Sequence, residues 1–149
     1  MHPPTNAHPQ VPLHIYKEGP SWPPGLAQIP SPPDELWALG KAELLGERPS
    51  IAIVGTRSPT EYGRGQALRF GAALARVGMC VISGLARGID SAAHQGALEV
   101  GGDTIAVLGS AVDQPWPLGP LTTQVAREGL LLSEYPPGTG ARRHHFPMR

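Results

Sequence analysis

The sequence lacks most of the features that mark secreted or membrane proteins. It has a single cysteine, Cys80, which cannot form an internal disulfide and is expected to be a small core residue. No run approaches the roughly 18 consecutive apolar residues of a membrane span, and the proline-rich start lacks the apolar core of a signal peptide. Acidic and basic side chains balance at 12 each, so the chain is not an indiscriminate polycation. We expect a soluble cytoplasmic protein.

Lysine is absent from residues 51–149, although this part of the chain carries nine arginines and seven acidic side chains. Residues 1–50 carry three basic and five acidic side chains, so the charge is uneven along the chain. Arginine makes bidentate phosphate contacts and stacks on bases better than lysine does. The bias therefore favours a polyanionic partner, with genomic base composition as the alternative explanation.

Two apolar strands, at residues 51–54 and 79–82, each run into a glycine-containing turn and then into a helix. A helix that begins just after a strand presents unpaired backbone N–H groups and a positive dipole end, which suit a phosphate group. The turn residues are Gly55, Thr56 and Arg57 in the first case, and Ser83, Gly84 and Arg87 in the second. Because each turn adds an arginine, the pair indicates a site for a long polyanion.

Strands and helices alternate from residue 51 onward. Apolar strands are expected at 51–55, 79–83, 104–108 and 129–133, and amphipathic helices at about 60–77, 88–100 and 118–128. Continuously apolar strands that alternate with helices require a mostly parallel sheet with helices on both faces, so the predicted class is α/β, Rossmann-like. Ligands of such sheets bind outside the carboxyl ends of the strands, where both anion turns fall.

Three segments differ in composition. Residues 1–12, with four prolines and two histidines, are predicted to be a disordered tail. Residues 13–50 mix prolines with large apolar side chains, which predicts a proline-rich arm that packs on the core and contains a short helix at 33–39. Residues 51–149 are predicted to be the Rossmann-like domain that binds the polyanion.

The motifs of nucleotide-binding enzymes are missing. A dinucleotide fingerprint needs G-x-G-x-x-G at the first turn and an acid after the second strand, but the first turn reads Gly-Thr-Arg-Ser and the second strand ends in Ser-Gly. A Walker phosphate loop needs Gly-Lys followed by Ser or Thr, and this tripeptide does not occur. We expect no catalytic residue and no cofactor.

Two histidine motifs could carry chemistry. Asp90 and His94 lie four residues apart on one helical face and could form an acid–base dyad. An internal hydrogen bond that fixes the helix start against the sheet is the favoured interpretation, because no nucleophile accompanies them. His144 and His145 are adjacent in a segment expected to be extended, where their side chains point to opposite faces, so we expect no metal site.

The last nine residues combine three arginines with one phenylalanine and no acid. This mixture suits single-stranded nucleic acid, in which cations hold the backbone and a splayed base stacks on the ring. An ordinary solvated tail is the alternative. The segment follows residues 133–138, which leave the same edge of the sheet as the anion turns, and this favours the binding role.

Several motifs in one order carry a family resemblance. They are Ile-Val-Gly-Thr-Arg at 53–57, Tyr-Gly at 62–63, Ser-Gly-Leu-Ala-Arg-Gly-Ile-Asp at 83–90 with Ala-His at 93–94, Thr-Ile-Ala-Val-Leu-Gly at 104–109, Ser-Glu-Tyr-Pro-Pro-Gly at 133–138 and Phe-Pro-x-Arg at 146–149. Together they resemble the DNA-processing protein A family, also called Smf, over about residues 16–149. The sequence departs from the family at Ala111, where a glycine is usual, and at Trp116-Pro117, where Tyr-Pro is usual; the second change keeps an aromatic residue before proline.

The resemblance implies an extended Rossmann fold that binds single-stranded DNA without catalysis. It also implies protection of incoming DNA in natural transformation, loading of the bacterial recombinase, and a homodimer. The family's motif continues into further strands, so residues 51–149 are expected to be incomplete at their C-terminus. The DNA-contacting positions that it implies are Gly55, Thr56, Arg57, Ser83, Gly84, Arg87, Arg143 and Phe146.

Two alternatives remain open. One is a Rossmann enzyme of the lysine-decarboxylase-like type, which cleaves nucleoside monophosphates; its Pro-Gly-Gly-x-Gly-Thr loop is absent from this sequence. The other is a truncated chain that keeps the fold without an activity.

Overall fold

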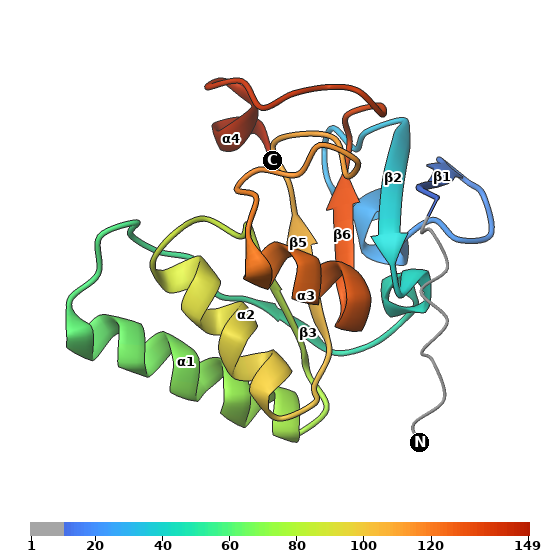
Figure 1. The fold of residues 1–149 in the computed structure, drawn as a ribbon. Coiled ribbons are helices and arrows are strands. Elements are labelled where there is room, and N and C mark those ends of the chain that lie inside the picture. The colour runs from blue at the N-terminus through green and yellow to red at the C-terminus, as the bar shows by residue number, and fades with distance from the viewer. Residues whose placement is uncertain (1–10) are drawn as a thin grey trace, which may run out of the picture.

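The computed structural model describes residues 11–149, which form one six-stranded sheet covered by helices. The strand order across the sheet is β1-β2-β6-β5-β4-β3 (Figure 1). Residues 1–10, the greater part of the predicted disordered tail, lie outside the described residues. The strands are β1 (Leu13–Tyr16), β2 (Glu35–Gly40), β3 (Ser50–Ala52), β4 (Cys80–Ser83), β5 (Thr104–Val107) and β6 (Leu130–Ser133).

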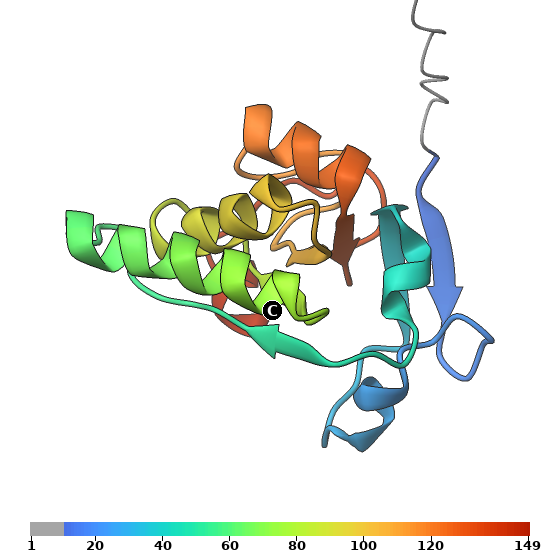
Figure 2. The ribbon, with the colours of Figure 1, turned by 90° about the horizontal axis from the view of Figure 1, so that it is seen from below.

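Strands β3 to β6 are parallel and lie side by side in chain order. Three helices connect them: α1 (Glu61–Arg76), α2 (Ile89–Glu99) and α3 (Pro120–Glu128). Right-handed crossovers that add strands in one direction place every helix on the same face, and Figure 2 shows these three helices in one layer. The expected α/β class with a mostly parallel Rossmann-like sheet is confirmed. The expectation of helices on both faces is wrong for the α-helices that connect the strands, because crossovers in one direction keep α1, α2 and α3 on a single face.

The two antiparallel strands come from the arm. β2 pairs with β6, and β1 pairs with β2, so the arm extends the sheet beyond its parallel part. The arm also carries two 3-10 helices, η1 (Pro24–Gln28) and η2 (Ala42–Leu45), whose leucines face the side of the sheet that α1 to α3 leave open. An apolar cleft of about 550 Å³ lies between these leucines and the sheet.

The predicted short helix at residues 33–39 is wrong, because this segment is β2. Leu36 and Ala38 are buried in the cluster beneath the arm, whereas Trp37 is buried in the cluster beneath α2 and α3. A strand covered on both faces is apolar at successive positions, and such a run cannot be told from a buried helix by periodicity. Pairing with the free edge of β6 decides the conformation.

Helices α1 and α2 pack closely because glycines lie at their contact. A Cβ on Gly71 of α1 would collide with the carbonyl oxygen of Ala93, and one on Gly96 of α2 would collide with that of Leu68. Cys80 is buried in β4, as expected for a core residue, and burial raises the pKa of its thiol. The tight packing of these helices fixes the start of α2, which belongs to the site described below.

Candidate nucleic-acid interface

The carboxyl ends of the four parallel strands lie along one edge of the sheet, which we call the rim. The loops that leave β3, β4, β5 and β6 all begin there. The short helix α4 (His145–Met148) and the C-terminal Arg149 lie beyond the upper end of β5 (Figure 1). The rim thus gathers both predicted anion turns and the basic-aromatic segment at the end of the chain.

Asp90 joins the two anion turns from beneath. It lies in the first turn of α2, is 5% exposed, and its two carboxylate oxygens accept hydrogen bonds from the backbone N–H groups of Gly55 (3.3 Å) and Gly84 (3.0 Å). The Ser83 hydroxyl donates to the carbonyl oxygen of Ile53 at 2.6 Å and ties the same two turns together. We call Gly55, Ser83, Gly84 and Asp90 the inner layer of the rim.

The expectation that the turn amides are free for a phosphate is therefore wrong for Gly55 and Gly84. The Asp90 carboxylate, at the start of α2, already occupies the position in which a phosphate could accept hydrogen bonds from these two N–H groups. The favoured interpretation of Asp90, a hydrogen bond that fixes the helix start against the sheet, is confirmed.

His94 has partners of its own, one turn further along α2. Its Nδ1 lies 2.7 Å from the hydroxyl oxygen of Thr104, and that hydroxyl donates to the carbonyl oxygen of Val81 at 2.7 Å. Since the hydroxyl proton is used, Nδ1–H is the donor to Thr104. Burial, together with the charge of Arg149, lowers the pKa of His94 to about 3, so the imidazole is neutral at ordinary pH.

Phe146 lies on α4 among arginine side chains. The guanidinium carbon of Arg57 is 5.5 Å from the ring centroid, and that of Arg149 is 5.3 Å from it, both over the ring. A Cβ on Gly109 would come within 2.9 Å of the Phe146 ring, so the absence of a side chain at Gly109 lets the ring sit against the β5 loop. The structure thus brings together two predicted site residues, Arg57 and Phe146, from opposite ends of the domain.

Arg149 was not among the predicted site residues, yet it contacts the second anion turn. A Cβ on Gly84 would collide with its guanidinium group. Burial lowers the pKa of Arg149, the charge of Asp90 raises it and that of Arg57 lowers it, but a guanidinium remains protonated throughout. The available signal was the Phe-Pro-x-Arg motif, in which one turn of α4 carries this arginine back over the rim.

These side chains line a cleft of about 330 Å³ on the outer side of the rim. The cleft is lined by Arg57, Gly84, Ala86, Arg87, Trp116, Pro117, Phe146 and Arg149. Three guanidinium groups and two aromatic rings line it, without a carboxylate; a neighbouring hollow of about 410 Å³ reaches Asp90. We call Arg57, Arg87, Trp116, Phe146 and Arg149 the outer layer of the rim.

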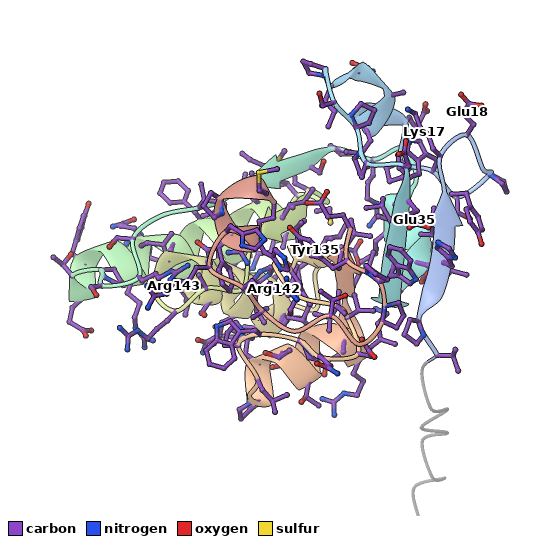
Figure 3. All side chains as sticks on the ribbon, turned by 90° about the horizontal axis from the view of Figure 1, so that it is seen from above. Lys17, Glu18, Glu35, Tyr135, Arg142 and Arg143 are labelled. Carbon is purple, nitrogen blue, oxygen red and sulfur yellow. The ribbon has the colours of Figure 1, made fainter. Side chains whose placement is uncertain are left out.

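The remaining predicted residues lie at the margin. Thr56 is exposed, its hydroxyl accepts from the Ser58 N–H at 3.1 Å, and its carbonyl accepts from the Ile89 N–H at 3.2 Å, so it shapes the first turn. Arg143 is exposed and is not brought into the cleft. Figure 3 looks down on the rim and shows Arg142 and Arg143 apart from each other on this face, remote from Lys17 on the arm.

The histidine pair at the start of α4 does not lie in an extended segment, and the prediction of oppositely directed side chains is wrong. The rings of His144 and His145 lie edge to face, with their centroids 4.5 Å apart. His145 is buried, donates from Nδ1 to the carbonyl oxygen of Gly109 at 3.0 Å, and stacks on Tyr135 at 3.9 Å. These contacts dock α4 on the rim. Within residues 11–149, no group of three or more potential metal ligands is present.

Comparison with known proteins identifies the family. Residues 13–149 match the family of DNA recombination-mediator protein A. The chain belongs to this family. Protein Smf from Synechocystis is 43% identical over 143 residues, covering 93% of this chain and 36% of the relative. The chain therefore spans about a third of the length of this relative.

Two solved structures of family members share the fold. DNA processing protein A from Streptococcus pneumoniae superposes with a TM-score of 0.85 at 34% identity, covering 93% of this chain and 49% of that one. The protein from Helicobacter pylori superposes with a TM-score of 0.77 at 30% identity, covering 89% of this chain and 60% of that one. The latter structure concerns the single-stranded DNA binding mode of that protein. In the described part of this chain, none of the helices has the length and hydrophobicity to cross a membrane.

Proposed function

We propose that this chain binds single-stranded DNA at the outer layer of the rim, without catalysing a reaction on it. The observation that carries the proposal is the cleft that three guanidinium groups and two aromatic rings line together, with no carboxylate in its lining. Guanidinium groups hold backbone phosphates, and a ring offers a surface on which any base can stack. Membership of a family whose Helicobacter pylori member binds single-stranded DNA supports the assignment.

The geometry favours single strands over duplex. The rim offers loops, a one-turn helix and a narrow cleft, and none of these is a long helix or a ribbon of the kind that enters a major groove. A base must leave its partner to reach an aromatic ring in a cleft. Binding is therefore expected to be independent of sequence and stronger for unpaired DNA.

Family membership supports a proposal about the wider role. We infer that the protein protects incoming DNA in natural transformation and helps to load the bacterial recombinase, acting in the cytoplasm and as a homodimer. The relatives that suggest these roles are longer than this chain, which covers 36% of Protein Smf from Synechocystis and 49% of the Streptococcus pneumoniae structure.

Fluorescence anisotropy with labelled single-stranded and duplex oligonucleotides of equal length tests the binding role. The expected result is tighter binding of the single strand, with an affinity that falls as salt rises. Equal or tighter binding of the duplex would refute the proposal. Incubation with nucleoside monophosphates, followed by chromatography for released base, tests the proposed lack of catalysis. Glu134 directly follows β6 at the rim and is an acid that such a reaction could use. Base release that disappears in Glu134→Gln would refute this part of the proposal.

A further inference from the structure

Phe146 is only one of two rings in the outer layer, and the two rings differ in their surroundings. Two guanidinium groups already lie over the Phe146 ring. Trp116 is 56% exposed, and among the described residues no cation and no aromatic ring is stacked on it. Its indole nevertheless lines the same cleft as Arg57 and Arg87. Because about half of this large ring is exposed to water, a ligand that stacked on it would gain affinity from burying its apolar surface.

The backbone holds Trp116 in this position. Its N–H donates to the buried hydroxyl oxygen of Ser110 at 3.0 Å. The carbonyl oxygen of Pro117 accepts a hydrogen bond from the hydroxyl of Thr122 at 2.6 Å, in the first turns of α3. The ring is therefore carried by an anchored segment, and less conformational entropy is lost when a ligand stacks on it.

Building on the proposed function, we propose that Trp116 is a second stacking surface for single-stranded DNA. A nucleobase enters the cleft and stacks on the indole, while Arg57 and Arg87 hold the flanking phosphates. The cleft, at about 330 Å³, falls in the size range of small-molecule sites, and its mixture of aromatic and guanidinium groups matches a nucleotide. With two rings at one cleft, the strand is held at more than one base.

The test compares an oligo-dT strand with an abasic strand of the same length, which keeps the phosphates and lacks the bases. Trp116→Ala is expected to weaken binding of oligo-dT about 5- to 150-fold, the range that follows from the loss of one stacked base, and to leave abasic binding unchanged. Trp116→Phe keeps a ring and is expected to restore most of the affinity. Leu118→Ala is the matched control, because Leu118 is 76% exposed and does not line the cleft.

Tryptophan fluorescence gives a readout that a structural role would not move. The other two tryptophans belong to the arm: Trp37 is buried in the core, and Trp22 is partly buried against the apolar cluster between the arm and the sheet. Saturating oligo-dT is expected to quench the fluorescence of the unmodified chain, and this quenching is expected to disappear in Trp116→Phe, which still binds DNA.

Two results would overturn the inference while leaving the proposed function intact. One is an equal loss of affinity for oligo-dT and for abasic DNA in Trp116→Ala, which would make Trp116 a structural residue. The other is quenching that persists in Trp116→Phe. A failure of the proposed function looks different, because the unmodified chain would then not prefer single strands to duplex at all.

Discussion

The inner and outer layers of the rim are built on opposite principles. In the inner layer, the donors and acceptors satisfy each other: Asp90 accepts from Gly55 and Gly84, and the Ser83 hydroxyl donates across to Ile53. In the outer layer, no ion pair within residues 11–149 engages Arg57, Arg87 or Arg149. The inner layer sets the geometry of the turns, and the outer layer keeps the guanidinium groups of Arg57 and Arg87 and the ring of Trp116 exposed at the cleft. A strand-turn-helix pattern alone does not distinguish the two, because Arg57 and Arg87 of the outer layer lie in the same two turns as the residues of the inner layer.

The largest effect is expected from Asp90→Ala, which removes the acceptor of the inner layer. Two backbone N–H groups would lose a charged partner, and hydrogen bonds to charged groups contribute about 1.5–3 kcal/mol each. Because the Gly55 bond is long, we expect the free energy of unfolding to fall by about 3 kcal/mol in total. Urea unfolding measures this value.

Asp113→Ala is the matched control for that variant, since Asp113 is exposed and also accepts hydrogen bonds from a loop amide, that of Gly138 at 3.0 and 3.1 Å. Its cost is expected to be smaller, about 1 kcal/mol. Equal costs for the two variants would remove the distinction between a buried organising acid and a surface acid.

Phe146→Ala is the next largest change and acts on the outer layer. It is expected to weaken single-stranded DNA binding by about 1–3 kcal/mol through the loss of a stacked base. The slope of log affinity against log salt should stay nearly constant, because stacking releases no counterion. Anisotropy titrations over a series of salt concentrations measure both quantities. A clear drop in slope would instead mean that the ring acts by positioning Arg57 and Arg149.

A pH effect is expected from His94, which is buried beneath the rim. Its pKa is about 3 in the folded chain and about 6.5 when unfolded, so the unfolded chain binds the extra proton between these values. The contribution of the neutral His94 to the free energy of unfolding is therefore fully present above pH 6.5 and is lost as the pH falls toward 3. On going from pH 7.5 to pH 5.5, the free energy of unfolding is expected to fall by about 1.4 kcal/mol because of this group. Urea unfolding of the unmodified chain and of His94→Gln isolates it, and an unchanged pH dependence in the variant would contradict the assignment.

The smallest expected effect is on the salt dependence of Arg57→Ala. Loss of one phosphate contact on a single strand lowers the slope of log affinity against log salt by about 0.7. The matched control is Arg76→Ala at the far end of α1, an exposed arginine outside the cleft, which should leave the slope unaltered. If Arg57→Ala also leaves it unaltered, Arg57 serves the structure of the rim rather than the DNA.

The sequence predicted the parallel half of the fold well. All four apolar runs after residue 50 are strands, and the three helices between them begin and end within two residues of the expected bounds. Local pattern suffices there, because each strand pairs with the next one along the chain. The local pattern failed for β2, which was predicted to be a helix. Its partner β6 lies about ninety residues further along the chain, and pairing with β6 is what makes this segment a strand.

The site was predicted in part. Arg57, Arg87, Gly84 and Phe146 do meet at one cleft, because motif and strand order place their loops on the same edge. The sequence placed Asp90 at the helix start. It could not show that Asp90 accepts hydrogen bonds from the amides of Gly55 and Gly84, because this depends on how the two loops approach each other. Trp116 stood out only as a departure from the usual Tyr-Pro. Neither its exposure nor its neighbours can be read from the sequence.

Residue-resolved hydrogen exchange, measured with and without a single-stranded oligonucleotide, tests the division of the rim into two layers most directly. We predict that the amides of Gly55 and Gly84 are protected in the free chain, because Asp90 already accepts hydrogen bonds from them. Added DNA should then slow exchange mainly in the loops that carry Arg57, Arg87, Trp116 and Phe146. Fast exchange at Gly55 and Gly84 that slows only when DNA binds would contradict the account, since it would mean that these amides hold the phosphate themselves.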